Sequence, residues 1–226
     1  GRATNTKTAM LVFFEGNDLE ETVREAHRIE KMSEPVTTFS LLPKSPEEWL
    51  AHLLSRYPRL YLARKLDFLW HPVTVTWRGP NASYFHNEKV TPVTVVYTPP
   101  DTNQIAPEDR AIVSSTLAEW AGLSRQLGME PWIVYMPCKR RVLDGHLEFF
   151  PGVERTLIDW SPSNLPEFIE RIAYRSGMRF VDLTDRLVDE TRQGRLTYNP
   201  VMDTHLNRHG SLIVAQAISE ALMSPQ

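Results

Sequence analysis

The sequence of 226 residues has little of three features that mark particular classes of protein. It contains one cysteine, Cys138, so no disulfide can form within the chain and no zinc site can be built from clustered cysteines. No apolar run approaches about 18 residues, the length that a membrane-spanning helix needs. The net charge is -3 and the basic run at residues 139–141 is short. We therefore expect no membrane span in this chain and no nucleic-acid partner.

The composition is that of a packed globular protein. Hydrophobic residues make up 42% of the chain and charged residues 23%, which favours a buried core over disorder. No signal peptide is visible, and the chain starts with Gly1 and enters an apolar run within ten residues. We expect a single domain over residues 1–226 that lacks its N-terminal part. The compartment stays open, since both the cytoplasm and the periplasm suit a chain without disulfides.

Alternating helix and strand patterns predict an α/β fold with a mainly parallel sheet. Residues 10–14 and 132–136 are continuous apolar runs, typical of strands buried on both faces, and residues 180–183 form a third strand. Helices are expected from Asp18 to about residue 32 and over residues 47–70 (interrupted near Pro58), 107–128, 165–177, 187–192 and 208–223. Residues 72–98 contain alternating segments with aromatic residues, which indicate an inserted hairpin or flap.

The most informative segment is residues 203–210, Asp-Thr-His-Leu-Asn-Arg-His-Gly, which leads into the last helix. Asp203 stands two residues before His205. An aspartate that accepts the Nδ1–H of a histidine fixes its tautomer and stabilises the imidazolium that forms in base catalysis. The same residues also suit a surface loop in which Asp203 makes a turn and Asn207 caps the helix. A third interpretation is a metal site built from Asp203, His205 and His209.

A second polar segment, Glu-Gly-Asn-Asp at residues 15–18, follows the first predicted strand. Asp18 can cap the next helix with Glu21 as its capping-box partner, which would explain the segment by itself. Because sites gather at the carboxyl ends of parallel strands, Asn17 is also a candidate site residue.

Together the two segments resemble the middle and last blocks of the SGNH/GDSL hydrolase family. The last block is similar in Asp-Thr-His-Leu-Asn-x-x-Gly before a helix, and the short spacing from Asp203 to His205 resembles the members tied to exopolysaccharide modification, including alginate-acetylation proteins. Many other members place the aspartate three residues before the histidine. In the middle block, Glu15 stands where the family has glycine. The resemblance covers about residues 9–32 and 129–223.

The resemblance implies a three-layer α/β/α sandwich and an ester hydrolase or O-acyltransferase that acts on a small-molecule or carbohydrate ester, with acetylated polysaccharide as the expected class. No metal or organic cofactor is implied. His205 would be the general base, Asp203 would orient it, and Asn17 would donate to the oxyanion. Lys139, in a Pro-x-Lys segment, would meet an anionic or acetylated sugar; the alternative is a solvated basic loop. The same resemblance favours a periplasmic or extracellular location.

The serine nucleophile of the family is not in this chain, which contains neither Gly-Asp-Ser nor Gly-x-Ser-x-Gly. In the family the serine block precedes the asparagine block, so we expect it upstream of Gly1 and expect this chain alone to have little or no esterase activity. Two other functions stay open. One is a metal-dependent hydrolase that uses Asp203, His205 and His209. The other is a non-catalytic, degenerate member that binds glycans through residues 72–98.

Overall fold

The computed structural model describes residues 7–33, 79–201 and 204–223. The chain divides into two compact units, residues 1–26 together with 79–226, and residues 27–78. Of the second unit only residues 27–33, the end of helix α1, are among the described residues. The site and the contacts discussed below lie in the first unit.

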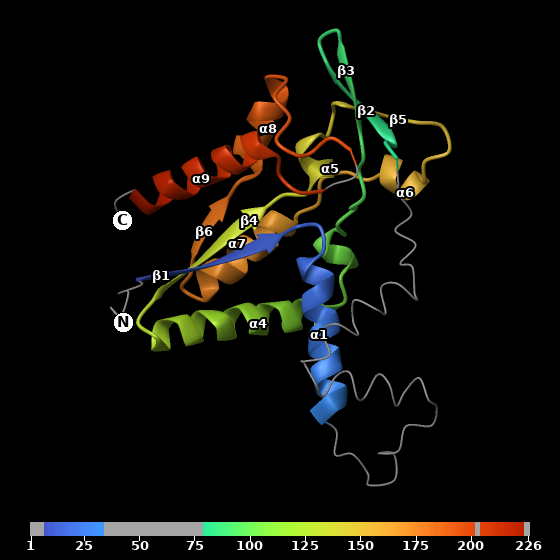
Figure 1. Ribbon diagram of the computed structural model, residues 1–226. Coiled ribbons are helices and arrows are strands. Elements are labelled where there is room, and N and C mark those ends of the chain that lie inside the picture. The colour runs from blue at the N-terminus through green and yellow to red at the C-terminus, as the bar shows by residue number, and fades with distance from the viewer. Residues whose placement is uncertain (1–6, 34–78, 202–203, 224–226) are drawn as a thin grey trace, which may run out of the picture. The chain divides into compact units, whose positions relative to one another are not determined.

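Figure 1 shows the helices and strands of the described residues. The strands are β1 (Thr8–Phe14), β2 (Ala82–His86), β3 (Lys89–Val93), β4 (Glu130–Met136), β5 (Leu147–Phe149) and β6 (Arg179–Asp182). The helices are α1 (Asp18–Ser33), α4 (Pro107–Gln126), α5 (Lys139–Val142), α6 (Arg155–Ile158), α7 (Leu165–Arg175), α8 (Thr184–Arg192), α9 (Arg208–Met223) and the 3-10 turn η2 (Thr102–Gln104). None of these described helices has the length and apolarity that crossing a bilayer requires.

The described strands form two three-stranded sheets. The first has the order β1-β4-β6 and is parallel throughout, with Phe14 opposite Met136 and Val134 opposite Val181. The second has the order β3-β2-β5 and is antiparallel. The predicted α/β fold with a mainly parallel sheet is therefore confirmed, and an antiparallel sheet accompanies it.

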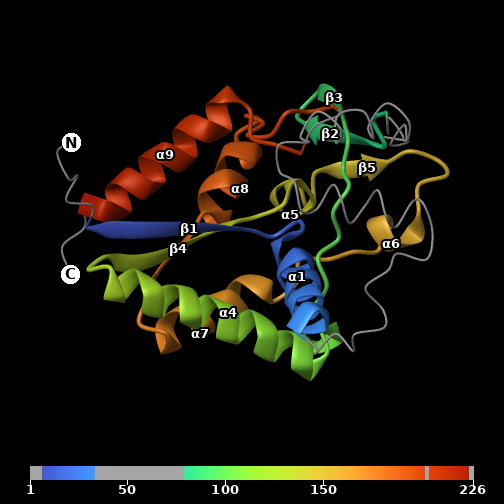
Figure 2. The ribbon, with the colours of Figure 1, turned by 60° about the horizontal axis from the view of Figure 1, so that its bottom comes forward.

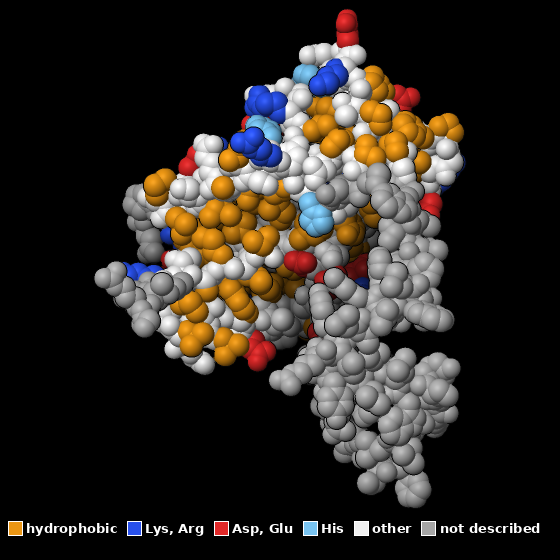
Figure 3. All heavy atoms as spheres, in the orientation of Figure 1, with side chains coloured by type: hydrophobic (Ala, Val, Ile, Leu, Met, Phe, Trp, Pro, Cys, Tyr) orange, Lys and Arg blue, Asp and Glu red, His pale blue; other side chains and the backbone are white. Residues whose placement is uncertain are grey.

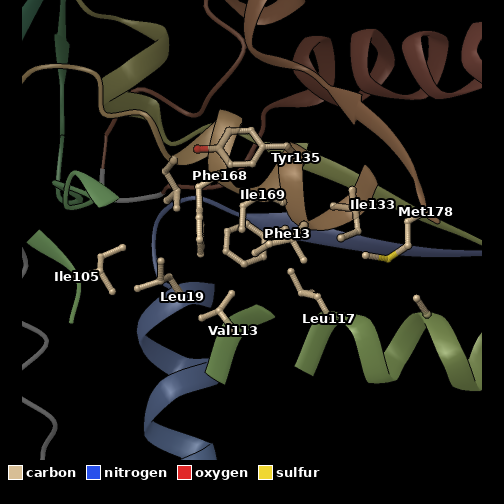
Figure 4. Packing of buried hydrophobic residues seen from close by; sticks show 14 residues of the cluster. Phe13, Leu19, Ile105, Val113, Leu117, Ile133, Tyr135, Phe168, Ile169 and Met178 are labelled. Atoms are coloured by element: carbon tan, nitrogen blue, oxygen red, sulfur yellow. The ribbon is translucent and has the colours of Figure 1, made fainter. Parts of the chain in front are cut away.

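Alternate side chains of the parallel sheet pack against different helices. Ile133 and Tyr135 of β4 belong to one core cluster together with residues of α4 and α7 (Figure 4). Val134, between them, belongs to a second cluster with Leu187 of α8 and Ala217 of α9. Figure 2 shows α8 and α9 on one side of the sheet and α4 and α7 on the other. Because side chains alternate along a strand, β4 is buried on both faces, as its continuous apolar run predicts.

Strand β1 lies at the edge of the parallel sheet. Within the described residues it pairs with β4 alone, and the side chain of Val12 is 48% exposed. Figure 3 shows hydrophobic side chains gathered over the region where Figure 1 draws β1, between α9 and α4. The predicted burial of residues 10–14 on both faces holds in part: Leu11 and Phe13 pack in the cluster with α4 and α7, and Met10 packs in the cluster with α8 and α9, whereas Val12 is exposed.

Helix α1 begins at Asp18 as predicted, but Asp18 does not cap it. The Asp18 carboxylate accepts the backbone N–H of Phe14 at 2.6 Å. The side-chain amide of Asn17 donates to Glu21 at 2.6 Å, and the backbone N–H of Glu21 donates to the Asn17 carbonyl. The predicted capping box between Asp18 and Glu21 is wrong, because the end of β1 and the Asn17 side chain engage these two carboxylates instead.

Residues 82–93 form the antiparallel hairpin β2–β3, inside the range where the sequence predicts an inserted hairpin or flap. Its turn contains Asn87 with a φ of 51°, in the left-handed region that asparagine tolerates better than most residues. Residues 72–78 of the predicted insertion and the helix predicted over residues 47–70 lie outside the described residues. Residues 94–97 follow β3 outside any strand.

Candidate functional site

A pocket of about 550 Å³ lies at the end of β1 and β4. It is lined by Phe14, Asn17, Tyr97, Met136, Tyr198, Thr204, His205, Leu206 and Ser211. Phe14 and Met136 are the paired last residues of the two strands. The pocket therefore brings Asn17 and His205 together at the carboxyl ends of parallel strands, where ligands bind in such sheets.

A short antiparallel ladder holds the backbone around His205. Asn199 N–H donates to the His205 carbonyl at 3.0 Å, and Asn207 N–H donates to the Thr197 carbonyl at 2.9 Å. These bonds fix the chain at His205 and just after it, and the exposed side chain of His205 lines the pocket. Asp203 lies outside the described residues, so its pairing with His205 stays a prediction.

Asn207 caps α9, as the sequence predicts. Its Oδ1 accepts the backbone N–H of Gly210 at 2.9 Å, and its Nδ2 donates to the Leu196 carbonyl at 2.7 Å. One side chain therefore ties the start of α9 to the loop opposite His205. Helix α9 also packs closely against this loop, since a Cβ added to Gly210 would lie 2.0 Å from the carbonyl oxygen of Thr197.

Asn17 contributes an amide to the pocket beside an apolar wall. One of its amide hydrogens is donated to Glu21, and because a side-chain amide has two, a second can be donated to a ligand. The wall is formed by Phe14 and Tyr97, whose rings meet edge to face with 5.6 Å between their centroids. Glu21 therefore orients the amide that the sequence predicts as an oxyanion donor.

Lys139 lies in the interior rather than in a solvated basic loop. Lys139, Arg140 and Arg141 are 3%, 5% and 8% exposed, so the solvated-loop interpretation is wrong. The Lys139 ammonium donates to the carbonyls of Asn199 at 2.6 Å and Thr94 at 3.1 Å. Lys139 is not among the residues that line the pocket, and its predicted contact with substrate stays a prediction.

Cys138 does not supply a nucleophile to this pocket. Its side chain is completely buried, and this burial raises the pKa of the thiol well above its ordinary value. A thiol attacks as its thiolate, which such an environment disfavours. Cys138 therefore packs as a small buried side chain.

His209, proposed as a metal ligand in one interpretation, contacts a carboxylate of α8. Its Nε2 lies 2.5 Å from the carboxylate of Glu190, which also accepts from Arg195. Across residues 7–33, 79–201 and 204–223, no group of three or more His, Cys, Asp or Glu side chains could hold a metal ion. A site using His209 would have to bind the metal through Nδ1 or break the contact of Nε2 with Glu190.

The cluster of Glu190, Arg195 and His209 predicts a pH-dependent stability. The hydrogen bond from Arg195, followed by that from His209, lowers the pKa of Glu190 to about 2 from 4.5. The folded value lies below the unfolded one, so the carboxylate stabilises the fold fully above about pH 4.5 and loses this effect as the pH falls through about 2. We expect Glu190→Gln to lower Tm by about 1–3 °C at pH 7 and by less at pH 3.

Calorimetry of the wild type and the variant at both pH values measures this difference. Asp189→Asn is the matched control, because Asp189 and its partner Arg192 are both mostly exposed and their pair should contribute little. A difference between wild type and Glu190→Gln that is equal at pH 7 and pH 3 would contradict the prediction.

Tyr198 and Ser211 line the pocket but are not among the predicted site residues. The hydroxyl of Tyr198 donates to the Pro137 carbonyl, and Ser211 Oγ donates to the Asn207 carbonyl at 3.0 Å. Ser211 follows the predicted cap by four residues, so its place on the first turn of α9 could be inferred. Nothing local marks Tyr198, because its partner lies 61 positions away.

No protein-family model, curated protein or solved structure matches the chain. The geometry of the pocket and the motifs that it brings together are therefore the features that bear on function.

Proposed function

We propose that the chain is the C-terminal portion of an SGNH/GDSL-type ester hydrolase or O-acyltransferase with a three-layer α/β/α core. One observation carries the proposal: His205 and Asn17 line the same pocket at the ends of β1 and β4. A base and an amide donor in one pocket are two of the groups that acyl transfer through a serine requires. The layers are supported by α8 and α9 packing on one face of the sheet and α4 and α7 on the other.

In the proposed mechanism, a serine expected upstream of residue 1 attacks the carbonyl carbon of the ester. Its proton passes to His205 as the new C–O bond forms, while Asp203 holds the imidazole in the required tautomer. Asn17 donates its second amide N–H to the developing oxyanion. Collapse of the intermediate expels the alcohol, which takes the proton from His205. Water or a second hydroxyl then attacks the acyl-serine, giving hydrolysis or transfer.

The open edge of β1 supports the delivery of this serine by a further strand. Within the described residues β1 pairs with β4 alone, so the backbone groups on its other side lack a neighbouring strand. A strand added parallel to β1 would end beside Phe14, next to Asn17. The loop after such a strand would reach the pocket, because parallel strands end at the same edge of a sheet.

Acetylated polysaccharide is the substrate class that we propose. The pocket combines the rings of Phe14 and Tyr97 with the hydroxyl groups of Thr204 and Ser211. Aromatic rings provide apolar surface for a short acyl group or a sugar face, and hydroxyl groups can bond to sugar hydroxyls.

The glycan-binding alternative receives less support from residues 72–98. Tyr84, one of the aromatic residues of that segment, is 2% exposed, and its hydroxyl donates to the Thr191 carbonyl at 2.7 Å. Tyr84 therefore packs inside the protein, although Tyr97 does line the pocket.

Hydrolysis of an aryl acetate tests the proposal. We expect little turnover by the 226-residue chain and clear turnover by a product that includes the coding sequence upstream of Gly1. In the longer product, His205→Ala should lower kcat by about 10³-fold or more, and Asn17→Ala by about 10²-fold. His86→Ala, which changes a histidine that does not line the pocket, is the matched control and should leave kcat unchanged.

Three results would reject the proposal. Loss of turnover on chelation would favour a metal-dependent hydrolase. Glycan binding by the longer product without turnover would favour a degenerate binding member. Robust, His205-dependent turnover by the 226-residue chain alone would place the nucleophile within this chain rather than upstream.

A further inference from the structure

We infer that the buried basic turn α5 positions the two loops that carry the candidate site. Lys139 holds the loop of His205, and Arg141 holds the loop of Asn17. This inference rests on the proposed function only in taking His205 and Asn17 as site residues. Lys139 and Arg141 are not among the residues that line the pocket, so each would act through the backbone or side chain that it holds.

One residue, Asn199, links Lys139 to His205 by hydrogen bonds. Its ammonium donates to the Asn199 carbonyl at 2.6 Å, and the N–H of Asn199 donates to the His205 carbonyl at 3.0 Å. The second acceptor of the ammonium is the Thr94 carbonyl at 3.1 Å. Removing a buried donor takes a hydrogen bond from each of its acceptors, and where water cannot replace that bond the cost exceeds the net worth of the bond itself. Loss of the ammonium should therefore displace Asn199 and, with it, His205.

Two further contacts hold residues 198–200, and one of them reaches the turn after β4 directly. Thr94 N–H donates to the Pro200 carbonyl at 2.8 Å, so Thr94 bonds to Lys139 through its carbonyl and to Pro200 through its N–H. The hydroxyl of Tyr198, which is 2% exposed, donates to the Pro137 carbonyl. Lys139 and Tyr198 therefore join residues 198–199, which pair with the loop of His205, to the turn after β4.

Arg141 supports the opposite side of the pocket through a buried ion pair. Its Nε donates to the Glu15 carboxylate at 2.7 Å, and Glu15 is only 2% exposed. The same carboxylate accepts the backbone N–H of Cys138 at 2.8 Å, while Arg141 Nη2 donates to the Ser163 carbonyl at 2.7 Å. Glu15 stands two residues before Asn17. The pair therefore fastens the end of β1, from which Asn17 projects, to the turn after β4.

Arg140 provides a matched control within the same turn. It is 5% exposed, and its guanidinium donates to the Trp160 carbonyl at 2.8 Å and pairs with Asp144. It also lies over the rings of Phe149 and Trp160. The described contacts of its side chain lie within residues 144–160, so none is on either site loop. Arg140→Met removes a buried cation from α5 without removing a direct support of His205 or Asn17.

Solution NMR of the 226-residue chain tests the inference. The ring signals of His205 are assigned with His205→Gln, and the side-chain NH₂ signals of Asn17 with Asn17→Asp. Lys139→Met should shift the His205 ring signals by several linewidths and leave the Asn17 signals in place. Arg141→Met should shift the Asn17 signals and leave those of His205. Arg140→Met should move neither set, although it removes a buried cation as the other two do.

Two results would overturn the inference. One is a shift of both sets of signals by all three substitutions, which would mean that α5 supports the fold as a whole. The other is unchanged His205 signals in Lys139→Met. If Arg141→Met does not fold, Glu15→Gln replaces it and must shift the Asn17 signals alone. Since no readout depends on turnover, an absence of esterase activity would reject the proposed function without deciding this test.

Discussion

Replacing Gly210 by alanine is expected to lower the free energy of unfolding by about 3 kcal/mol or more. A Cβ on Gly210 would lie 2.0 Å from the carbonyl oxygen of Thr197 and 2.9 Å from its carbonyl carbon, so backbone must move. The Thr197 carbonyl also accepts the N–H of Asn207. The displacement therefore disrupts the ladder beside His205 as well as the start of α9. Urea denaturation at pH 7 measures the change.

Gly122→Ala is the matched control for this substitution. Gly122 also lies in a helix, α4, but no atom outside its local backbone lies within 4 Å of an added Cβ. Alanine in an open helix interior is more stable than glycine by about 0.5–1 kcal/mol. The two changes should therefore have opposite signs. Wild-type stability in Gly210→Ala would show that α9 does not approach Thr197 as closely as described.

Replacing Arg141 by methionine is expected to cost about 3–5 kcal/mol, because it leaves the Glu15 carboxylate buried without its cation. Glu15 is 2% exposed, and without Arg141 it would keep the N–H of Cys138 but lose its guanidinium partner. A second substitution, Glu15→Leu, removes that stranded charge. We expect Glu15→Leu to be less harmful in the Arg141→Met background than in the wild type, with a coupling of about 1–3 kcal/mol.

Arg140→Met is again the control. Its cost should differ from that of Arg141→Met because the partner of Arg140, Asp144, is more exposed than Glu15. The side chain of Asp144 is 38% exposed, so water can solvate it when Arg140 is lost. We expect a smaller cost for Arg140→Met than for Arg141→Met in the same denaturation experiment. Additive effects of Arg141→Met and Glu15→Leu would show that the two side chains do not interact as a buried pair.

The local patterns of the sequence predict most of the described elements well. Pro107 begins α4, and Gly128, with a φ of 73°, follows its end. Asn207 caps α9, which spans residues 208–223 as predicted. The boundary at Asp18 is also correct, but its capping chemistry is not, because the carboxylate is bound by the N–H of Phe14 at the end of β1. A capping pattern in the sequence cannot show that the backbone N–H at a strand end will bind the same carboxylate.

The candidate site, like the fold, could be predicted only in part from the sequence. The motifs select Asn17 and His205, but their meeting in one pocket depends on the parallel pairing of β1 with β4, which sets Phe14 opposite Met136. The motif around Lys139 is where the sequence misleads most. Three consecutive cations are typical of solvent-exposed chain, since buried lysine and arginine are rare unless they are paired.

By itself, the sequence determined the α/β class, the helix ends at Asn207 and Gly128, and two candidate site residues. These features depend on hydrophobic period and capping, which act within a few residues along the chain. Only the tertiary structure decided that β1 is exposed at an edge and that Lys139 and Arg141 are buried. A buried charge is tolerated only where other groups complete its hydrogen bonds. Here Glu15, Thr94 and Asn199 supply them from distant parts of the chain.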